Sequence, residues 1–248
     1  VALFMIPGML MTIFATEPHR AEAPKTLYAS VVEPFSEFIN RAGLKHAMLV
    51  LLFILLYKLG DSMATALATP FYIDMGFSNT DIGTIVKGSG LVMQILGGFV
   101  GGIWMLKVGI NRGLWVFGVV QLVTILGFAW LANAGPFETV GAIERGMLAV
   151  VIGGEALGVG LGTVAYVAYM ARETNPAYTA TQLALFTSLS AVPRSIFNAL
   201  TGGMVEALGW EIFFYVCTLL AIPGMLLLFK VAPWNTRGSD QQKPEIQV

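Results

Sequence analysis

Five charged side chains stand inside stretches of the sequence that are otherwise mostly apolar: Lys58, Asp61, Lys87, Glu155 and Arg194. A charged group at the centre of a lipid bilayer costs about 2.5–3.5 kcal/mol on insertion scales. Such groups therefore pair with one another, line a watery cavity, or bind a substrate or a proton. Their presence predicts a polar interior among the helices that carry them.

Two of these residues form a pair in the segment "LLYKLGD" (55–61). Lys58 and Asp61 are three residues apart, so they lie on the same face of a helix. Both stand about a dozen residues from either end of their apolar run, too deep for a side chain to reach the membrane surface. We expect the pair to act in binding or in proton transfer; the alternative is that the two groups only neutralise each other.

Lys87 and Arg194 are the other two cations. Lys87 lies in "KGSG" (87–90), where small neighbours suit a crowded interior, and the alternative is that its side chain extends to the membrane surface. Arg194 follows Pro193, which frees a backbone carbonyl and tends to kink a helix. Its planar guanidinium suits a substrate carboxylate or phosphate. Alternatively, it bonds the freed carbonyls or Glu155 as a structural latch.

Glu155 lies in "GGEALGVGLG" (153–162), beside a ridge of glycines that would receive a neighbouring helix. Burial disfavours the charged form of a carboxylate, so a group in this position can take up and release a proton. The alternative is a permanent ion pair with a lysine or an arginine.

Six apolar stretches are long enough to cross a hydrocarbon core of roughly 30 Å, and they cover residues 46–74, 81–106, 112–133, 146–170, 178–204 and 210–230. The protein is therefore predicted to be all-α and polytopic. An apolar stub covers residues 1–15, and the chain opens on Val1 within it, so we expect a fragment. The predicted domains are the end of a preceding helix (1–15), a linker (16–45), a six-helix bundle (46–230) and a polar tail (231–248).

The lysines and arginines between these stretches predict the orientation, because cytoplasmic connections carry an excess of them. Arg145 lies in an outer connection, whereas the linker, the inner connections and the tail hold Arg20, Lys25, Arg41, Lys45, Lys107, Arg112, Arg172, Lys230, Arg237 and Lys243. The linker and the tail are therefore predicted to be cytoplasmic. The linker segment "YASVVEPFSEFINRAG" forms either an amphipathic helix on the membrane surface or a solvated connector.

The composition excludes several classes of function. Only 12% of the residues are charged, about half the share in soluble domains. The net charge of −1 offers no basic face to a nucleic acid. One cysteine and two histidines leave no metal site to expect, and no cofactor is implied. The sequence contains no HExxH, GxSxG or GxxxxGK[ST] motif, so an enzyme is not expected.

Several segments together resemble the AmpG-type muropeptide permeases of the major facilitator superfamily: "LLYKLGD" (55–61), "GFSNTDIGTIVKGSGLVMQILGGFVGG" (76–102), "FGVVQL" (117–122), "YTATQLALFTSLSAVPR" (178–194) and "VEALGW" (205–210). The resemblance covers about residues 16–230. It implies the six-helix C-terminal half of a transporter whose N-terminal half is missing from this chain. Two departures from the family pattern are Met105 and Leu106, where an acidic residue is usual, and Pro193 in place of glycine.

The resemblance implies proton-coupled import of a glycopeptide, GlcNAc-anhydroMurNAc with or without its peptide, across the bacterial inner membrane for peptidoglycan recycling. Lys58, Lys87 and Arg194 would then bind carboxylates of the substrate, while Asp61 and Glu155 would carry the proton. Sugar hydroxyls would meet Tyr57, Gln94, Gln182 and Asn198, although such residues often only bond neighbouring helices. The partners would be the substrate, protons, the lipid bilayer and the missing half.

Three alternatives remain open from the sequence. One is a permease of the same fold for another bulky anion, such as an acyl-CoA-like thioester or a peptide. Another is a non-transporting membrane scaffold or sensor derived from a transporter half. The third is a half-size transporter that works as a dimer.

Overall fold

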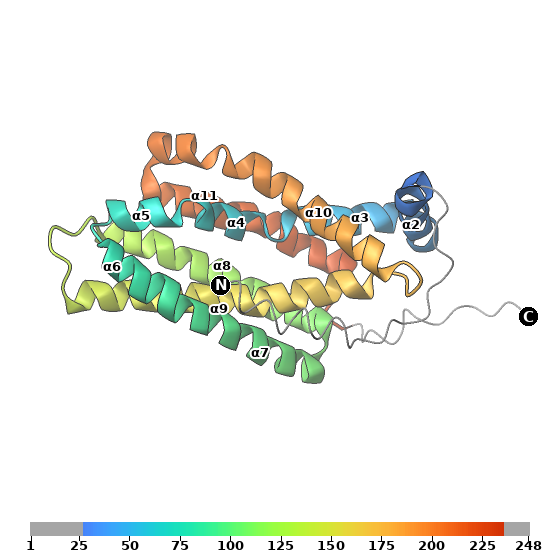
Figure 1. Cartoon of the computed structure of the whole chain (residues 1–248), viewed down its shortest axis with the longest axis horizontal. Coiled ribbons are helices and arrows are strands. Elements are labelled where there is room, and N and C mark those ends of the chain that lie inside the picture. The colour runs from blue at the N-terminus through green and yellow to red at the C-terminus, as the bar shows by residue number, and fades with distance from the viewer. Residues whose placement is uncertain (1–26, 236–248) are drawn as a thin grey trace, which may run out of the picture.

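The computed structural model describes residues 27–235 and builds this part of the chain from helices (Figure 1). In chain order these are α2 (Leu27–Ala42), α3 (Leu44–Leu56), α4 (Leu59–Ala66), α5 (Ala68–Asp74), α6 (Asn79–Asp81), the π-helix η2 (Ile82–Ser89), α7 (Gly90–Val108), α8 (Ile110–Ala134), α9 (Ala142–Arg172), α10 (Thr179–Asn198) and α11 (Thr201–Val231). The predicted all-α fold is confirmed. The predicted helix end at 1–15 and most of the predicted tail lie outside the described residues.

Five stretches in the described chain are long and apolar enough to cross a membrane: Leu44–Asp74, Asn79–Val108, Ile110–Ala134, Ala142–Arg172 and Thr201–Val231. They match five of the six predicted spans, and the chain is a polytopic membrane protein. The span predicted at 178–204 is not among them, because α10 carries Arg194 and several serines and threonines. The structure has α10 there, followed by a short break and the first turns of α11, which Gly209 interrupts with a φ of 76°.

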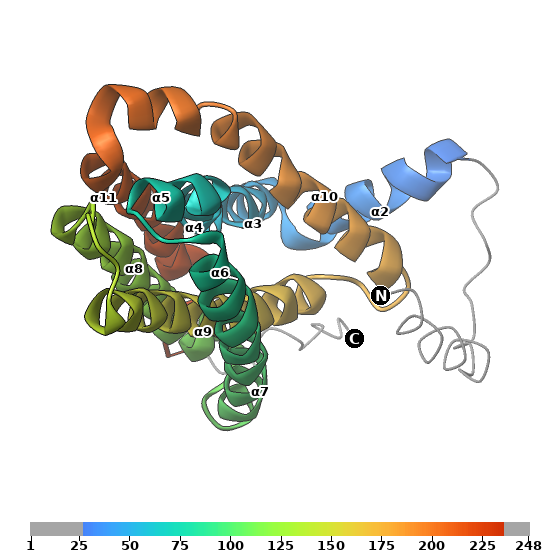
Figure 2. The same ribbon diagram turned by 60° about the vertical axis from the view of Figure 1, so that its left-hand side comes forward.

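The helices pack in a series that leaves α7 and α10 apart. α7 packs on α9, α9 on α8, α8 on α11, and α11 on α3 and α4, which also contact α10. Figure 2 shows α10 and α7 on opposite sides of this arrangement. Helices that are distant in the series can therefore face each other across an interior space.

The buried side chains of the described residues form two apolar clusters. One contains Phe53 and Tyr57, and the other contains Leu59 and Phe71. Lys58 stands between them in the sequence and is half-buried. The apolar core is thus divided at the level where the first span carries its charge pair.

The first span is broken, although its sequence predicted one continuous helix over 46–74. α3 ends at Leu56, α4 begins at Leu59, and a second irregular residue, Leu67, separates α4 from α5. Beside the first break, the Tyr166 hydroxyl of α9 donates to the carbonyl oxygen of Ile54 at 2.6 Å. Non-helical backbone at membrane depth is stable where protein or a watery cavity satisfies its polar groups.

Glycines bring α7 and α9 into close contact. A Cβ added to Gly97 would collide with the backbone carbonyl oxygen of Leu157, and one added to Gly160 would collide with that of Gln94. Gly102 has nothing within 4 Å of its hypothetical Cβ. Small residues at such crossings allow helix backbones to approach in membranes.

We expect Gly97→Val to lower the thermal unfolding midpoint of the complete protein in detergent, because overpacking costs about 1–3 kcal/mol. Gly102→Val adds the same side chain to the same helix at an open position, so its midpoint should stay near that of the wild type. Circular dichroism measures both. Equal shifts in the two variants would mean that the close approach of α7 and α9 is not the cause.

Candidate functional site

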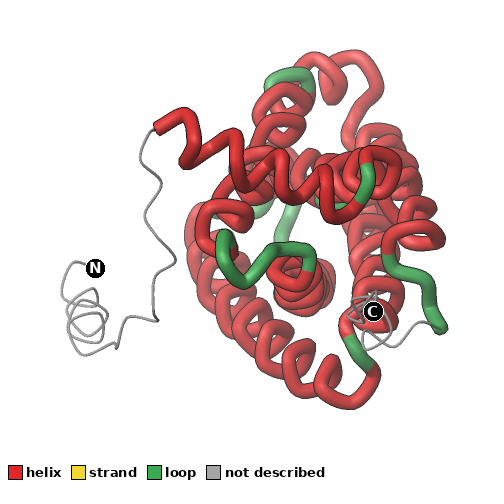
Figure 3. Tube along the Cα trace, turned by 90° about the vertical axis from the view of Figure 1, so that its right-hand side faces the viewer, coloured by secondary structure: helices red, strands yellow, loops and turns green. Residues whose placement is uncertain are grey.

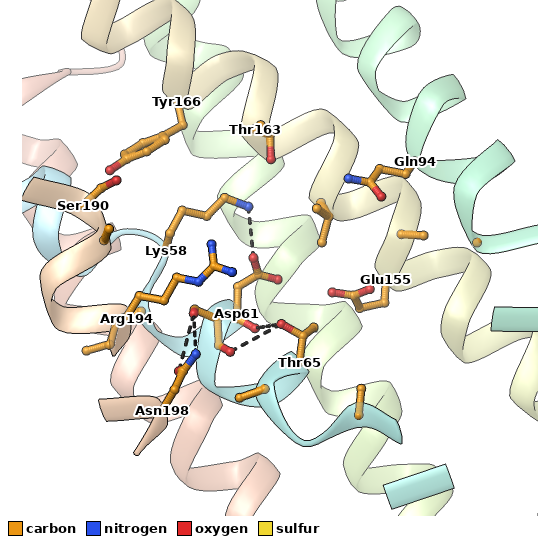
Figure 4. Close-up of a pocket in the computed structure, with 18 of the residues that line it drawn as sticks. Lys58, Asp61, Thr65, Gln94, Glu155, Thr163, Tyr166, Ser190, Arg194 and Asn198 are labelled. Carbon is orange, nitrogen blue, oxygen red and sulfur yellow. Dashed lines mark hydrogen bonds and ion pairs between the residues drawn. The ribbon is translucent and has the colours of Figure 1, made fainter. Parts of the chain in front are cut away.

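A cavity of about 1210 Å³ lies among α3, α4, α5, η2, α7, α9, α10 and the start of α11. Seven of the nine residues predicted to form the site line it: Lys58, Asp61, Lys87, Gln94, Glu155, Arg194 and Asn198. Figure 4 labels all of them except Lys87 and shows the labelled side chains around the space on different segments of the chain. The structure therefore brings together residues that are up to 140 positions apart in the sequence.

Lys58 and Asp61 form an ion pair at the first break. The Lys58 Nζ lies 3.0 Å from Asp61 Oδ2, and the two side chains are 20% and 15% exposed. Lys58 is the second of the two residues between α3 and α4, while Asp61 lies in the first turn of α4. The pair faces the cavity, so either partner can be reached by a ligand or by water.

Glu155 is the buried acid of the site, with 8% of its surface exposed. Its Oε1 has no hydrogen-bond partner in the described part of the chain, and no ion pair there includes it. Figure 4 shows the carboxylate directed from α9 into the cavity, on the side of Asp61. The permanent ion pair considered from the sequence is absent from the described residues.

Arg194 and Lys87 are the two cations of the site that form no ion pair with a described residue. Both side chains are exposed and line the cavity. Figure 4 shows Arg194 extending from α10 toward Lys58 and Asp61, with Glu155 beyond Asp61 on the far side of the space. The latch between Arg194 and Glu155 is not formed in this structure.

Two amides complete the predicted set. Gln94 is an exposed residue of α7 on the cavity wall. Asn198 of α10 contacts the Ser62 hydroxyl of α4 at 3.4 and 3.5 Å. Contacts of this length are weak hydrogen bonds, so the Asn198 amide is available to a ligand.

Two predicted site residues lie elsewhere. Tyr57 is buried in the core, stacks on Tyr166, and donates its hydroxyl to the carbonyl oxygen of Leu114 at 2.9 Å. Gln182 is 1% exposed and bonds Pro34 and Glu37 of α2. Neither lines the cavity, because each side chain points from its helix toward a neighbouring helix.

The cavity also contains polar residues that the sequence had not singled out, among them Thr65, Tyr72, Thr163, Tyr166, Thr187 and Ser190. Thr163 and Tyr166 follow Glu155 at eight and eleven positions, which is the spacing of one helix face. Ser190 precedes Arg194 by four. Helical spacing from each charged residue would have found them. Among residues 27–235, no cluster of three or more His, Cys, Asp or Glu side chains is placed to hold a metal ion.

Comparison with known proteins gives relatives for most of the chain. No family model matches it. An uncharacterized protein of Haemophilus influenzae is 52% identical over 94% of the chain and 55% of its own length. The putative transporter AmpG 4 of Rickettsia conorii is 36% identical over 81% of the chain and 46% of its own length. The anhydromuropeptide permease of Escherichia coli is 36% identical over 92% of the chain and 45% of its own length. The chain spans about half the length of these curated relatives.

Proposed function

Because the chain belongs to the AmpG-type permease family, we propose that the complete protein imports cell-wall muropeptides across the bacterial inner membrane. The expected substrate is GlcNAc-anhydroMurNAc with or without its stem peptide, taken up for peptidoglycan recycling. The family consists of transporters, so we propose transport and no catalysis. One observation carries the proposal: the cavity presents two cations, neither paired with an acid of residues 27–235, beside a Lys–Asp pair and a buried acid.

Recognition of the substrate would divide between charge and hydrogen bonding. Arg194 and Lys87 line the cavity from α10 and η2 and would bind carboxylates of a stem peptide. A guanidinium binds a carboxylate with two parallel hydrogen bonds. Gln94 and Asn198 would bond the sugar hydroxyls. The missing half of the transporter would supply the opposite wall.

Coupling to protons would depend on the charge pair. In an alternating-access cycle, two halves of a transporter rock about a site near the membrane midplane. A proton bound by Asp61 would weaken its 3.0 Å ion pair with Lys58 and free that ammonium group for the substrate. Glu155 also lines the cavity and would hold the proton or relay it. The linker and the tail would face the cytoplasm.

The test is uptake of radiolabelled GlcNAc-anhydroMurNAc-tripeptide by the complete protein in cells that lack their own muropeptide permease. We expect saturable uptake that stops when an uncoupler dissipates the proton gradient. A panel of unlabelled competitors separates the alternatives. Stronger competition by an acyl-CoA or by a simple peptide would assign another bulky anion, and no uptake of any of these at normal expression would favour a scaffold or sensor.

A further inference from the structure

α2 lies outside the stretches that can cross the membrane, and Figure 3 shows it running across one end of the bundle. Its residue Glu37 accepts hydrogen bonds from three side chains. Oε1 accepts from Asn175 Nδ2 at 2.7 Å and from Arg41 Nε at 2.9 Å, and Oε2 accepts from Gln182 Nε2 at 2.7 Å. One carboxylate thus joins α2 to the α9–α10 connection and to α10.

Further contacts hold the helix in the same place. The Gln182 amide also donates to the carbonyl oxygen of Pro34 at 2.8 Å and accepts from the Asn175 backbone N–H at 2.6 Å. Arg41 donates to the carbonyl oxygen of Glu173 at 2.7 Å. Phe38 is 1% exposed and packs edge to face on Phe186 of α10, with 5.1 Å between the ring centroids. α2 is therefore docked by buried polar and apolar contacts together.

The two helices that α2 joins form two walls of the cavity. α2 runs into α3 through Gly43, which turns the chain with a φ of 76°, and α3 leads to Lys58. Gln182 lies near the start of α10, which carries Arg194 and Asn198 into the cavity. α3 and α10 also pack directly on each other, so the contacts of α2 add to the packing that holds these two helices at this end of the bundle.

We propose that α2 is a brace between α3 and α10, and that Glu37 is the positioning residue that fixes α10, and with it Arg194, against the Lys58–Asp61 pair. The expected effect on uptake rests on the proposed transport function, but the positioning of α10 by Glu37 does not. The spacing of the helices is a separate, directly measurable property. The brace must break, or move together with α10, whenever the cavity opens at this end.

We expect Glu37 to stay charged, and the brace to stay in place, near neutral pH. Burial would raise the pKa of Glu37, but the hydrogen bonds from Asn175 and Gln182 and the nearby Arg41 outweigh it, so its pKa lies below the ordinary 4.5. Next to this cluster, Glu173 accepts from Arg41 through its backbone carbonyl oxygen, while its carboxylate pairs with Arg172 at 3.3 Å. A depressed pKa stabilises the folded form above about pH 4.5, and this contribution disappears as the pH falls through the folded value.

The experiment measures the distance between α3 and α10 in the complete protein. Nitroxide labels are placed at Met48→Cys and Ser188→Cys, both exposed positions, after Cys217→Ser and replacement of any other cysteine. Double electron–electron resonance then compares Glu37→Ala and Glu37→Gln with the unmodified brace. Glu33→Ala is the matched control, because Glu33 is an exposed acid one turn earlier on α2.

We expect a broader and longer distance distribution for Glu37→Ala, an intermediate one for Glu37→Gln, and no change for Glu33→Ala at neutral pH. In uptake, Glu37→Ala should raise KM for the peptide-bearing substrate about tenfold, which corresponds to about 1.4 kcal/mol, because Arg194 would no longer be held where it binds the substrate carboxylate. An unchanged distance distribution would overturn the proposal, whatever uptake does. If the complete protein imports no muropeptide, the function proposed above fails, but the distance measurement still decides on the brace.

Discussion

Replacing Asp61 by Asn together with Glu155 by Gln is expected to abolish uptake of muropeptide against its concentration gradient. Both substitutions keep the size of the side chain and remove the group that can bind and release a proton. Asp61 faces the cavity in its pair with Lys58, and Glu155 is buried there with no hydrogen-bond partner for Oε1 among residues 27–235. The double variant should still exchange internal for external substrate, because exchange needs no net proton movement.

Uptake and exchange of labelled muropeptide in membrane vesicles, with an imposed pH gradient, measure this result. Each single variant shows which acid is required. Glu206→Gln is the matched control, since Glu206 is an exposed acid outside the cavity lining. Full, uncoupler-sensitive uptake by the double variant would show that neither acid couples transport to protons.

Replacing Arg194 by Ala is expected to raise KM for the peptide-bearing substrate about 10- to 100-fold, the loss that follows from one charge-assisted hydrogen-bonding group. Its guanidinium extends into the cavity from α10 (Figure 4) and pairs with no described acid. Arg194→Lys should recover only part of the affinity, because an ammonium group cannot bind a carboxylate through two parallel bonds. The sugar without its peptide should be affected less.

Initial rates at varied concentrations of the two substrates separate these effects. Lys107→Ala is the control, because it removes one cation from the exposed end of α7, away from the cavity. Wild-type KM for both substrates in Arg194→Ala would exclude this residue from anion binding. An equal rise in KM for both substrates would indicate that Arg194 binds the sugar that they share and not the peptide.

Much of this site follows from sequence because the cost of charge in lipid is so large. Lys58, Asp61, Glu155 and Arg194 stand out in apolar runs, and the structure places all four around one cavity. Uncharged polar residues give no such signal. Gln182 resembled Gln94 in the sequence, yet it bonds α2 while Gln94 faces the cavity.

The course of the helices was harder to predict than their existence. Neither residue between α3 and α4, Tyr57 or Lys58, is a proline or a glycine. η2 adopts a π-helical form over residues 82–89. Both depend on contacts with neighbouring helices, which hydropathy does not describe. The opposite case is α10, whose serines, threonines and Arg194 lower its hydropathy because one face lines the cavity.

At the break after α3, a carbonyl oxygen of the first span bonds a side chain of α9 and not its own helix. In an unbroken helix the carbonyl oxygen of Ile54 would bond the backbone N–H of Lys58, but here the Tyr166 hydroxyl takes that position at 2.6 Å. If α9 moved so that Tyr166 withdrew, this oxygen would be free to accept from the Lys58 amide. α3 and α4 would then join as one rod and turn the Lys58 side chain about its axis. The length of one cavity helix thus depends on a side chain of its neighbour.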